Sequence, residues 1–257
     1  MKWNVDPVLL SLGPLAIRYY SLMFVIGFIS MEKYVKGIFQ RAGKDPNLVS
    51  TLTVYIIAGT FIGARLAHVL FYDPVYYFSN PFSIIKVWEG GLASHGGYAG
   101  VIISVVLFLR KHKGINFFWL MDAIAGPCLF VGSLIRIGNF FNSEIVGKVS
   151  DVPWAIVFER VDPLPRHPAQ LYESIGYFTI AMILAWMFRF KEEKLKAGSV
   201  LATAIIMSFT FRFFIEFVKD NQSTISANLP INMGQLLSIG FVSFGVILLL
   251  KIRSKKD

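Results

Sequence analysis

The chain has 257 residues, of which 55% are hydrophobic and only 16% are charged, and its formal net charge at pH 7 is +9. This composition excludes an ordinary soluble domain and is typical of a polytopic membrane protein. A positive charge could indicate a nucleic-acid partner, but most basic residues lie in short loops between apolar runs, so we expect no nucleic acid.

Seven apolar segments approach the roughly 20 residues that a membrane-spanning helix needs. In chain order they cover about residues 17–38, 48–72, 93–110, 115–141, 169–189, 197–218 and 233–252. We find no internal repeat and no cleavable signal peptide. The sequence therefore predicts an all-α polytopic membrane protein, with residues 1–257 forming a single membrane domain.

The distribution of Lys and Arg predicts how these helices are oriented. The first, third and fifth connections, with the segment ends beside them, and the C-terminal end hold fifteen basic residues, whereas the alternate connections and the N-terminal end hold six. Because cytoplasmic loops carry the excess of positive charge, we expect the N-terminus outside and the C-terminus in the cytoplasm.

Two connections on the predicted outer side are long. Residues 73–92, called the arm below, contain Tyr76, Tyr77, Phe78 and Trp88, which suit the membrane interface. Residues 142–168, called the cap below, carry charges of both signs and several prolines. We expect the arm to be interfacial and the cap to be a small external structure.

Four arginines lie within the apolar segments, in what this orientation makes the outer half of the membrane: Arg18, Arg65, Arg136 and Arg212. Guanidinium groups in a dry site suit a phosphate, because arginine binds it bidentately and stays charged. Some of the four are expected to be structural. Arg212, for example, has Glu216 one turn later, and an internal ion pair is as plausible there as a ligand site.

The most polar membrane-helix end is GSLIRIGNFFNSEIVG, residues 132–147. It places Arg136, Asn139, Asn142 and Glu144 within nine positions. Arg136 and Asn139 are three residues apart and share a helical face. Ionisable groups within a membrane are functional candidates by default, although Arg136 alone could also extend to the surface.

Two histidines could take part in chemistry at the same side. His95 lies in GGLASHGGYAG, where the glycines suit either close approach of a ligand or simple helix packing beside a capping histidine. His167 stands in RHPAQLYE, just before the fifth apolar segment. Neither belongs to an HExxH or cysteine-containing metal pattern, and no GxSxG elbow is present. No metal or organic cofactor is indicated.

Five stretches together resemble the prolipoprotein diacylglyceryl transferase family: GGLASHGG, RIGNFFNSEIVG, RHPAQLYE, FRFFIEF and INMGQLLS. They occur in the expected order and span nearly the whole chain. Two positions depart from the family pattern, namely Ser143, where glycine is usual, and Lys219, where arginine is common.

The resemblance implies an enzyme of the bacterial plasma (inner) membrane, with its active site toward the outer leaflet. Such enzymes move the diacylglyceryl group of phosphatidylglycerol to the lipobox cysteine in the signal peptide of a prolipoprotein, releasing glycerol phosphate. The essential residues of the family match Tyr20, His95, Arg136, Asn139, Glu144, Gly147 and Arg212.

The resemblance also suggests a role for each group. Arg136 and Arg212 would hold the lipid phosphate and stabilise the leaving group. Asn139 and Asn142 would orient substrate oxygens, and Glu144 would position these amides. His95 and Tyr20 would assist deprotonation of the thiol, while His167 and Glu216 are further binding candidates.

A transporter for anions or lipids is the alternative, because it could also use arginines and glycine-rich helix breaks. The lack of an internal repeat and of matching charges on the inner half favours the enzyme.

Overall fold

The structure is a computed structural model that describes residues 1–13, 15–86, 90–191, 194–220 and 232–254; for residues 12, 15, 94, 95 and 191 it describes the backbone alone. The described part is mostly helical, as predicted. Seven long helices lie close to the seven predicted apolar segments: α1 (Tyr19–Arg41), α2 (Asn47–Phe71), α4 (Ser94–Lys111), α5 (Phe117–Asn142), α6 (Ala169–Lys191), α7 (Ser199–Ile215) and α8 (Met233–Ser254).

Four of these helices, namely α2, α5, α6 and α8, are long and apolar enough to cross a membrane, and α7 is apolar but only 17 residues long. Their exposed surface is rich in large apolar side chains. On α8, for example, Phe241, Phe244, Ile247 and Leu250 are all exposed. Such surfaces are stable in lipid and unfavourable in water, so the helices support an integral membrane protein.

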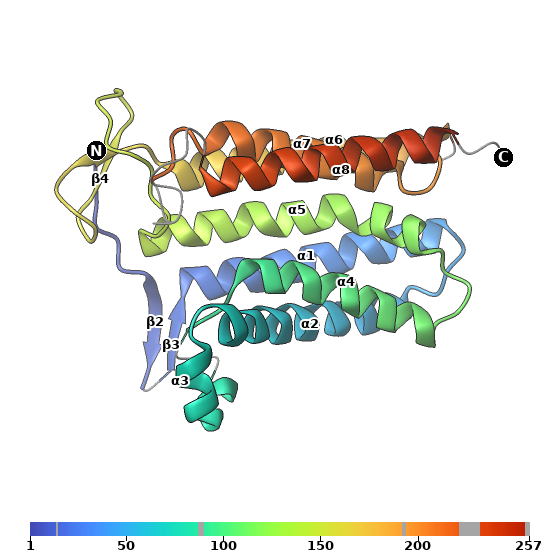
Figure 1. Ribbon diagram of the computed structural model, residues 1–257, viewed down its shortest axis with the longest axis horizontal. Coiled ribbons are helices and arrows are strands. Elements are labelled where there is room, and N and C mark those ends of the chain that lie inside the picture. Colours follow the sequence, from blue (N-terminus) through green and yellow to red (C-terminus); the bar gives the residue numbers. More distant parts are fainter. Residues whose placement is uncertain (14, 87–89, 192–193, 221–231, 255–257) are drawn as a thin grey trace. The chain divides into compact units, whose positions relative to one another are not determined.

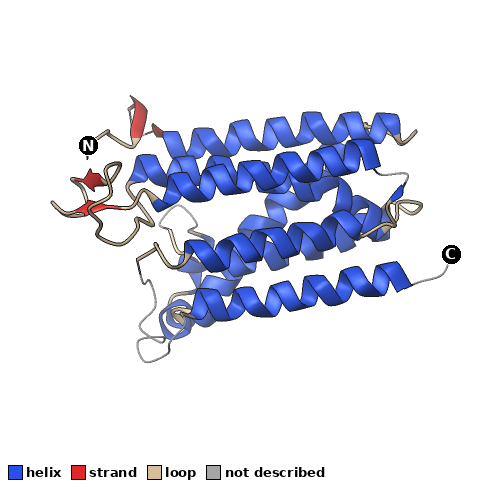
Figure 2. Ribbon diagram, turned by 90° about the horizontal axis from the view of Figure 1, so that it is seen from above, coloured by secondary structure: helices blue, strands red, loops and turns tan. Residues whose placement is uncertain are grey.

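Short strands were not predicted, and they complete the fold at one end of the helices (Figures 1 and 2). Strand β1 (Lys2–Trp3) pairs in parallel with β4 (Ile156–Phe158), and β4 pairs antiparallel with β5 (Pro165–Arg166). Strands β2 (Val8–Leu12) and β3 (Leu15–Arg18) form a separate hairpin. The all-α prediction therefore needs correction for the first 18 residues and for the cap.

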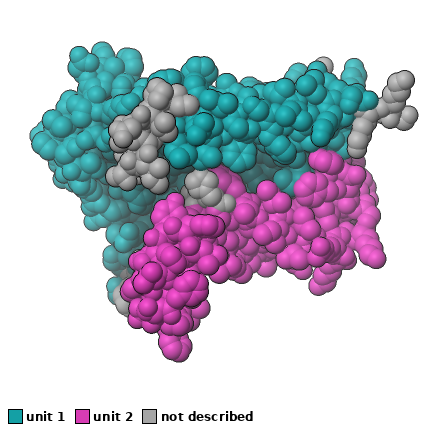
Figure 3. Space-filling view, in the orientation of Figure 1, with its two compact units in different colours: residues 1–34, 121–257 teal, residues 35–120 magenta. Residues whose placement is uncertain are grey.

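The chain forms two compact units, coloured in Figure 3. The first unit contains residues 1–34 and 121–257, and the second contains residues 35–120. In the first unit, α7 packs against both α6 and α8.

Glycines set the packing of α2 against α4 in the second unit. A Cβ added to Gly96 would lie 2.1 Å from the carbonyl oxygen of Gly63, and one added to Gly100 would lie 1.9 Å from that of Gly59. No side chain fits at these distances, so the backbones touch in the manner of small-residue helix pairs in membranes. The packing interpretation of these two glycines is therefore correct.

The arm contains α3 (Pro74–Ser79) and a 3₁₀ turn, η1 (Pro81–Ile85). Arg65 of α2 holds it in place. Its Nε donates to the carbonyl of Ile84 at 2.8 Å and an Nη donates to that of Gly90 at 2.6 Å, with further bonds to the carbonyls of Ser83, Lys86 and Gly91. Arg65 is thus a structural arginine. Phe78 and Phe82 are exposed on the arm, and Trp88 lies outside the described residues.

A small apolar core joins the cap to the end of α5. Phe140, Ile156 and Phe158 are buried together, and Trp3 packs on Phe140 with ring centroids 4.3 Å apart. The N-terminal strand therefore supports the helix end that carries the polar motif.

Candidate functional site

The polar motif begins in the last two turns of α5. An Nη of Arg136 donates to Oδ1 of Asn139 at 3.1 Å, and Nδ2 of Asn139 donates to Glu144 at 3.0 Å. Nδ2 of Asn142 donates to the other oxygen of Glu144, also at 3.0 Å. Arg136 and Asn139 meet on one helical face, as their spacing predicted, and the four side chains form one hydrogen-bonded group. Glu144 is its common acceptor.

A left-handed turn brings Glu144 back toward the helix. Ser143 has φ 56°, the amide of Ser143 donates to the carbonyl of Phe140, and the amide of Glu144 donates to that of Asn139. This pair of bonds is a Schellman motif, whose left-handed position favours glycine. Ser143 therefore occupies a backbone conformation that glycine adopts without strain.

A row of alternating charges extends from Arg136 across the first unit. Nε of Arg136 lies 3.2 Å from Glu173, Nζ of Lys219 lies 3.3 Å from Glu173 and 3.5 Å from Glu216, and Nε of Arg212 lies 3.7 Å from Glu216. We call these five residues the charged row. It contains the ion pair between Arg212 and Glu216, which was one of the two alternatives considered for this arginine.

Burial varies along the charged row. The side chain of Glu173 is completely buried and that of Lys219 is 7% exposed, whereas Arg136 and Arg212 at the two ends are 17% and 27% exposed. A buried carboxylate is stable only when it is paired. Glu173 and Glu216 therefore each pair with the Nε atom of one arginine, and the two arginine side chains are the most exposed members of the row.

Two members of the charged row were missed as site residues. Glu173 is a carboxylate inside an apolar segment, which is itself a signal of function. Lys219 follows FRFFIEF by two positions. Its pairing with Glu173 could not be anticipated, because the two residues are 46 positions apart.

Gly147 lies where two other segments meet. Its amide donates to the carbonyl of His167 at 3.0 Å, and the amide of Lys148 donates to that of Val218 at 2.9 Å. A Cβ on Gly147 would lie 2.6 Å from His167 and 2.7 Å from the carbonyl oxygen of Val218. Glycine is therefore required at this position by close backbone packing.

His167 contributes its backbone to that junction and its ring to a separate contact. Nδ1 of His167 lies 3.2 Å from the hydroxyl of Tyr172, which also accepts a hydrogen bond from Nε1 of Trp154 at 2.6 Å. Because the indole can only donate, the tyrosine hydrogen is available to the imidazole. This arrangement orients the His167 ring.

Tyr20 approaches the motif from α1. A Cβ on Gly138 would lie 2.7 Å from the Tyr20 ring, so the missing side chain of this glycine makes room for the tyrosine. Tyr20 is within electrostatic range of Glu144 and Arg136. The next aromatic pair, Tyr19 and Phe141, stacks with centroids 4.3 Å apart.

The start of α8 closes the other end of the charged row. Nδ2 of Asn232 donates to Glu216 at 3.2 Å, and a Cβ on Gly234 would lie 2.6 Å from the Glu216 carboxyl carbon. Asn232 and Gln235 also cap the helix reciprocally. The INMGQLLS motif thus positions Glu216.

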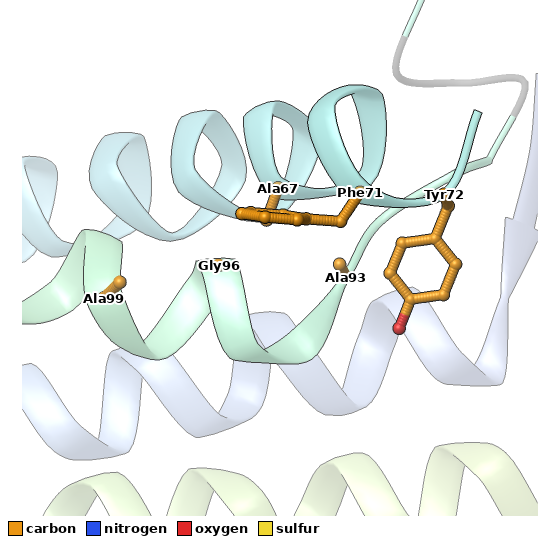
Figure 4. Close-up of a pocket in the computed structure, with 6 residues that line it drawn as sticks. All are labelled: Ala67, Phe71, Tyr72, Ala93, Gly96 and Ala99. Atoms are coloured by element: carbon orange, nitrogen blue, oxygen red, sulfur yellow. The ribbon is translucent and has the colours of Figure 1, made fainter. Parts of the chain in front are cut away.

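His95 is the one predicted site residue outside the first unit. Its backbone lies in the first turn of α4, and its side chain lies outside the described residues. Close by is an apolar cavity of about 370 Å³, lined by Ala67, Phe71, Tyr72, Ala93, Gly96 and Ala99 (Figure 4). The side chains that the structure describes around this cavity are all uncharged.

An arginine of the cap supports the site from outside. Arg166 lies 2.5 Å from Asp162 and 3.1 Å from Asp220, and it donates to the carbonyl of Gly147 at 3.1 Å. Its hydrogen bond with Asp162 lowers the pKa of that carboxyl and raises the pKa of the guanidinium. Arg166 therefore links the cap, the Gly147 junction and the segment after α7.

The described residues contain no cluster of three or more His, Cys, Asp or Glu suited to a metal ion. They do contain two partly exposed arginine side chains, Arg136 and Arg212, each paired with a buried glutamate. The side-chain amides of Asn139 and Asn142, both bonded to Glu144, lie at the Arg136 end. This arrangement can bind an anion and stabilise negative charge on it.

Comparison with known proteins gives one consistent result. A family model described as prolipoprotein diacylglyceryl transferase matches residues 7–251. A phosphatidylglycerol–prolipoprotein diacylglyceryl transferase of Tolumonas auensis is 43% identical over 254 residues, covering 99% of this chain and 98% of that protein. Proteins of the same name from Chloroherpeton thalassium and Bacteroides fragilis are 43% and 41% identical, covering 96% and 100% of this chain and 92% and 97% of their own lengths.

Proposed function

Because the chain belongs to the prolipoprotein diacylglyceryl transferase family, we propose that it transfers a diacylglyceryl group from phosphatidylglycerol to the lipobox cysteine of prolipoproteins, the first step of lipoprotein maturation. The observation that carries the proposal is the charged row, which ends in two partly exposed arginines within the stretch that matches the family.

The reaction exchanges one bond for another at a glyceryl carbon. The cysteine sulfur attacks the carbon that carries the phosphate ester, a C–S bond forms, and the C–O bond breaks. The electron pair leaves on glycerol phosphate, and the thiol proton passes to a base or to the departing phosphate. Negative charge therefore develops on the phosphate oxygen in the transition state.

Arg136 and Arg212 are the groups that meet this charge. Fixed cations near a developing anion lower the barrier without reorganisation. Glu173 and Glu216 pair with their Nε groups, which fixes the orientation of each guanidinium. Lys219 neutralises the two carboxylates between them.

Tyr20 and His95 are the candidates for activating the thiol, whose ordinary pKa of about 8.5 leaves it mostly protonated at neutral pH. Tyr20 lies beside the arginine–glutamate group, and His95 joins it in this role through the family motif. We expect His95→Gln to reduce transfer strongly while lipid binding is retained, as measured by product formation and by lipid retention on the purified protein. Full activity of this variant would remove His95 from the proton transfer.

We further propose seven membrane crossings, with the N-terminus, the arm and the cap outside and the site at the outer leaflet of the bacterial plasma membrane. The excess of Lys and Arg in the first, third and fifth connections and at the C-terminal end supports this orientation. Exposed aromatics on the arm, such as Phe78 and Phe82, suit the headgroup region.

The direct test incubates the purified protein with phosphatidylglycerol and a lipobox peptide. A diacylglyceryl mass addition to the peptide thiol and release of glycerol phosphate are expected, and a peptide with serine in place of cysteine is the control. Lipid movement between leaflets without any thioether product would instead indicate a transporter.

A further inference from the structure

We propose that Gln170 and Asn142 form a subsite that accepts hydrogen bonds from the headgroup hydroxyls of the lipid substrate, and so determine headgroup specificity. The inference rests on the proposed function and deepens it. It names the part of the lipid that lies beside the phosphate and the two side chains that recognise it.

Glu144 orients the side-chain amides of Asn139, Asn142 and Gln170. Nδ2 of Asn139 and Nδ2 of Asn142 each donate to its carboxylate at 3.0 Å, and Nε2 of Gln170 donates to its backbone carbonyl at 2.5 Å. A carboxylate and a carbonyl can only accept hydrogen bonds. Each amide must therefore direct its NH₂ group to Glu144 and its oxygen elsewhere.

The three amide oxygens do not have equal partners. Oδ1 of Asn139 accepts a hydrogen bond from Arg136 at 3.1 Å. Oδ1 of Asn142 and Oε1 of Gln170 are buried and accept a hydrogen bond from no residue that the structure describes. The Gln170 residue is 0% exposed. A buried acceptor without a donor is unfavourable and needs an explanation, which a bound ligand provides.

The partner that these two amide oxygens lack must be a hydrogen-bond donor, so it cannot be the phosphate. A phosphate diester has only acceptor oxygens, so it cannot satisfy two amide carbonyls and is bound instead by the guanidinium groups. A hydroxyl can donate to each carbonyl. The headgroup of phosphatidylglycerol is a glycerol that is esterified to the phosphate through one oxygen and keeps two free hydroxyls. It therefore matches a site in which hydrogen-bond acceptors lie beside cations.

The hydrogen-bonded chain of residues supports this placement. Arg136 bonds to Asn139, Asn139 and Asn142 bond to the same carboxylate, and Gln170 bonds to the same residue. Two residues, Asn139 and Glu144, therefore connect each acceptor side chain to Arg136 at one end of the charged row. Arg136 and Asn142 are partly exposed, so a headgroup that meets the arginine reaches Asn142 first, and the side chains that cover Gln170 move aside when it binds there.

The test compares two lipids, of which only one carries hydroxyls on its headgroup. Phosphatidylethanol has the same phosphate and acyl chains as phosphatidylglycerol, but its alkyl headgroup cannot donate. We expect the native protein to transfer from phosphatidylglycerol at least roughly tenfold faster, since one hydrogen bond is worth about a factor of ten at the upper end of its range. Gln170→Met keeps the side-chain length and removes the acceptor.

In Gln170→Met, the rate with phosphatidylglycerol should fall roughly tenfold, while the rate with phosphatidylethanol stays within about twofold. Asn142→Leu should reduce the same preference, and it provides the test if Gln170→Met does not fold. Thr53→Val is the matched control, because Thr53 is also buried, its hydroxyl has no hydrogen-bond partner among the described residues, and it lies on α2. Its lipid preference should equal that of the native protein, and thermal unfolding monitors the fold of each variant.

The outcomes separate this inference from the proposed function. A native protein that uses both lipids equally well, or a Gln170→Met variant that loses both rates in parallel, would show that these amides do not recognise hydroxyls, while the transferase function stands. A native protein that forms no thioether from either lipid would overturn the transferase function, and the subsite with it.

Discussion

Arg136 uses different edges of its guanidinium for different partners. Nε pairs with Glu173 of α6, and an Nη donates to Asn139 of its own helix. The planar group fixes the angle between these contacts and so the direction in which it can meet a ligand. An ammonium on a flexible chain has no such fixed geometry.

We therefore expect Arg136→Lys to restore little of the activity that Arg136→Ala loses. The lysine retains the positive charge but cannot pair with Glu173 and bind a phosphate bidentately at the same time. Transfer should fall at least roughly tenfold, which corresponds to about 1.4 kcal/mol of transition-state stabilisation. The thioether assay measures this, and native-like activity of the lysine variant would contradict bidentate binding.

Asp162 gives the cap a predictable response to acid. Its hydrogen bond with Arg166 holds the carboxyl pKa below the ordinary value of 3.8. A lowered pKa stabilises the folded cap at all pH values above 3.8, and this contribution is lost as the pH falls through the lower, folded-state pKa. Hydrogen exchange across the cap, corrected for intrinsic rates, should accelerate in that acidic range. Asp162→Asn should already exchange faster at neutral pH and lose this acid-dependent step.

At the scale of single residues, the sequence predicted some contacts of the candidate site residues but not all of them. The spacing of Arg136 and Asn139 and the pairing of Arg212 with Glu216 followed from helix geometry. Arg65 could not be separated from the other arginines, because its partners are backbone carbonyls of the arm. The pairing of Lys219 with Glu173 depends on a distant turn of the chain, which local spacing does not reveal.

Among the elements, α7 begins with backbone amides that are bonded to a side chain of another helix. Oδ1 and Oδ2 of Asp122, on α5, accept hydrogen bonds at 2.6 Å from the amides of Leu201 and Gly198 at the beginning of α7. The first amides of a helix have no partner within it. Asp122 supplies partners from a neighbouring helix and adds a favourable charge to the helix dipole. Since α7 carries Arg212, this contact also supports the site.

Asp122→Asn should destabilise the protein by about 1–3 kcal/mol, because an amide offers one acceptor where the carboxylate offers two. The effect is measurable as a lower midpoint of thermal unfolding in detergent. Asp151→Asn, at an exposed position of the cap, is the matched control and should unfold like the native protein. An unchanged midpoint for Asp122→Asn would show that water satisfies these amides equally well.

The helices were predictable because long apolar runs are a strong local signal. The strands of the cap were not, since β1 and β5 are two residues long and carry no periodicity. Their pairing is created by tertiary contacts such as that of Trp3 with Phe140. The glycines of α2 and α4 were visible in the sequence, but only the carbonyl contacts showed that helix packing requires them.

For the whole molecule, the orientation in the membrane is the property with the widest consequences. Replacing the single cysteine by serine (Cys128→Ser) gives a protein without thiols, into which cysteines can be introduced for labelling. An impermeant maleimide applied to intact cells should label Asp151→Cys in the cap. It should label Lys113→Cys, in the loop after α4, only after the membrane is opened. Labelling of Lys113→Cys in intact cells would contradict the proposed orientation.

The pairing of β1 with β4 has a consequence for how the protein is made. Lys2 pairs with Val157, so the first strand to leave the ribosome has no partner until more than half of the chain has followed. At 5–20 residues per second, the delay is about 8–30 s. During this time α1, α2, α4 and α5 can all be inserted. The strands of the cap therefore pair late in biogenesis. The contact of Trp3 with the end of α5, which carries Asn139 and Asn142, also forms late.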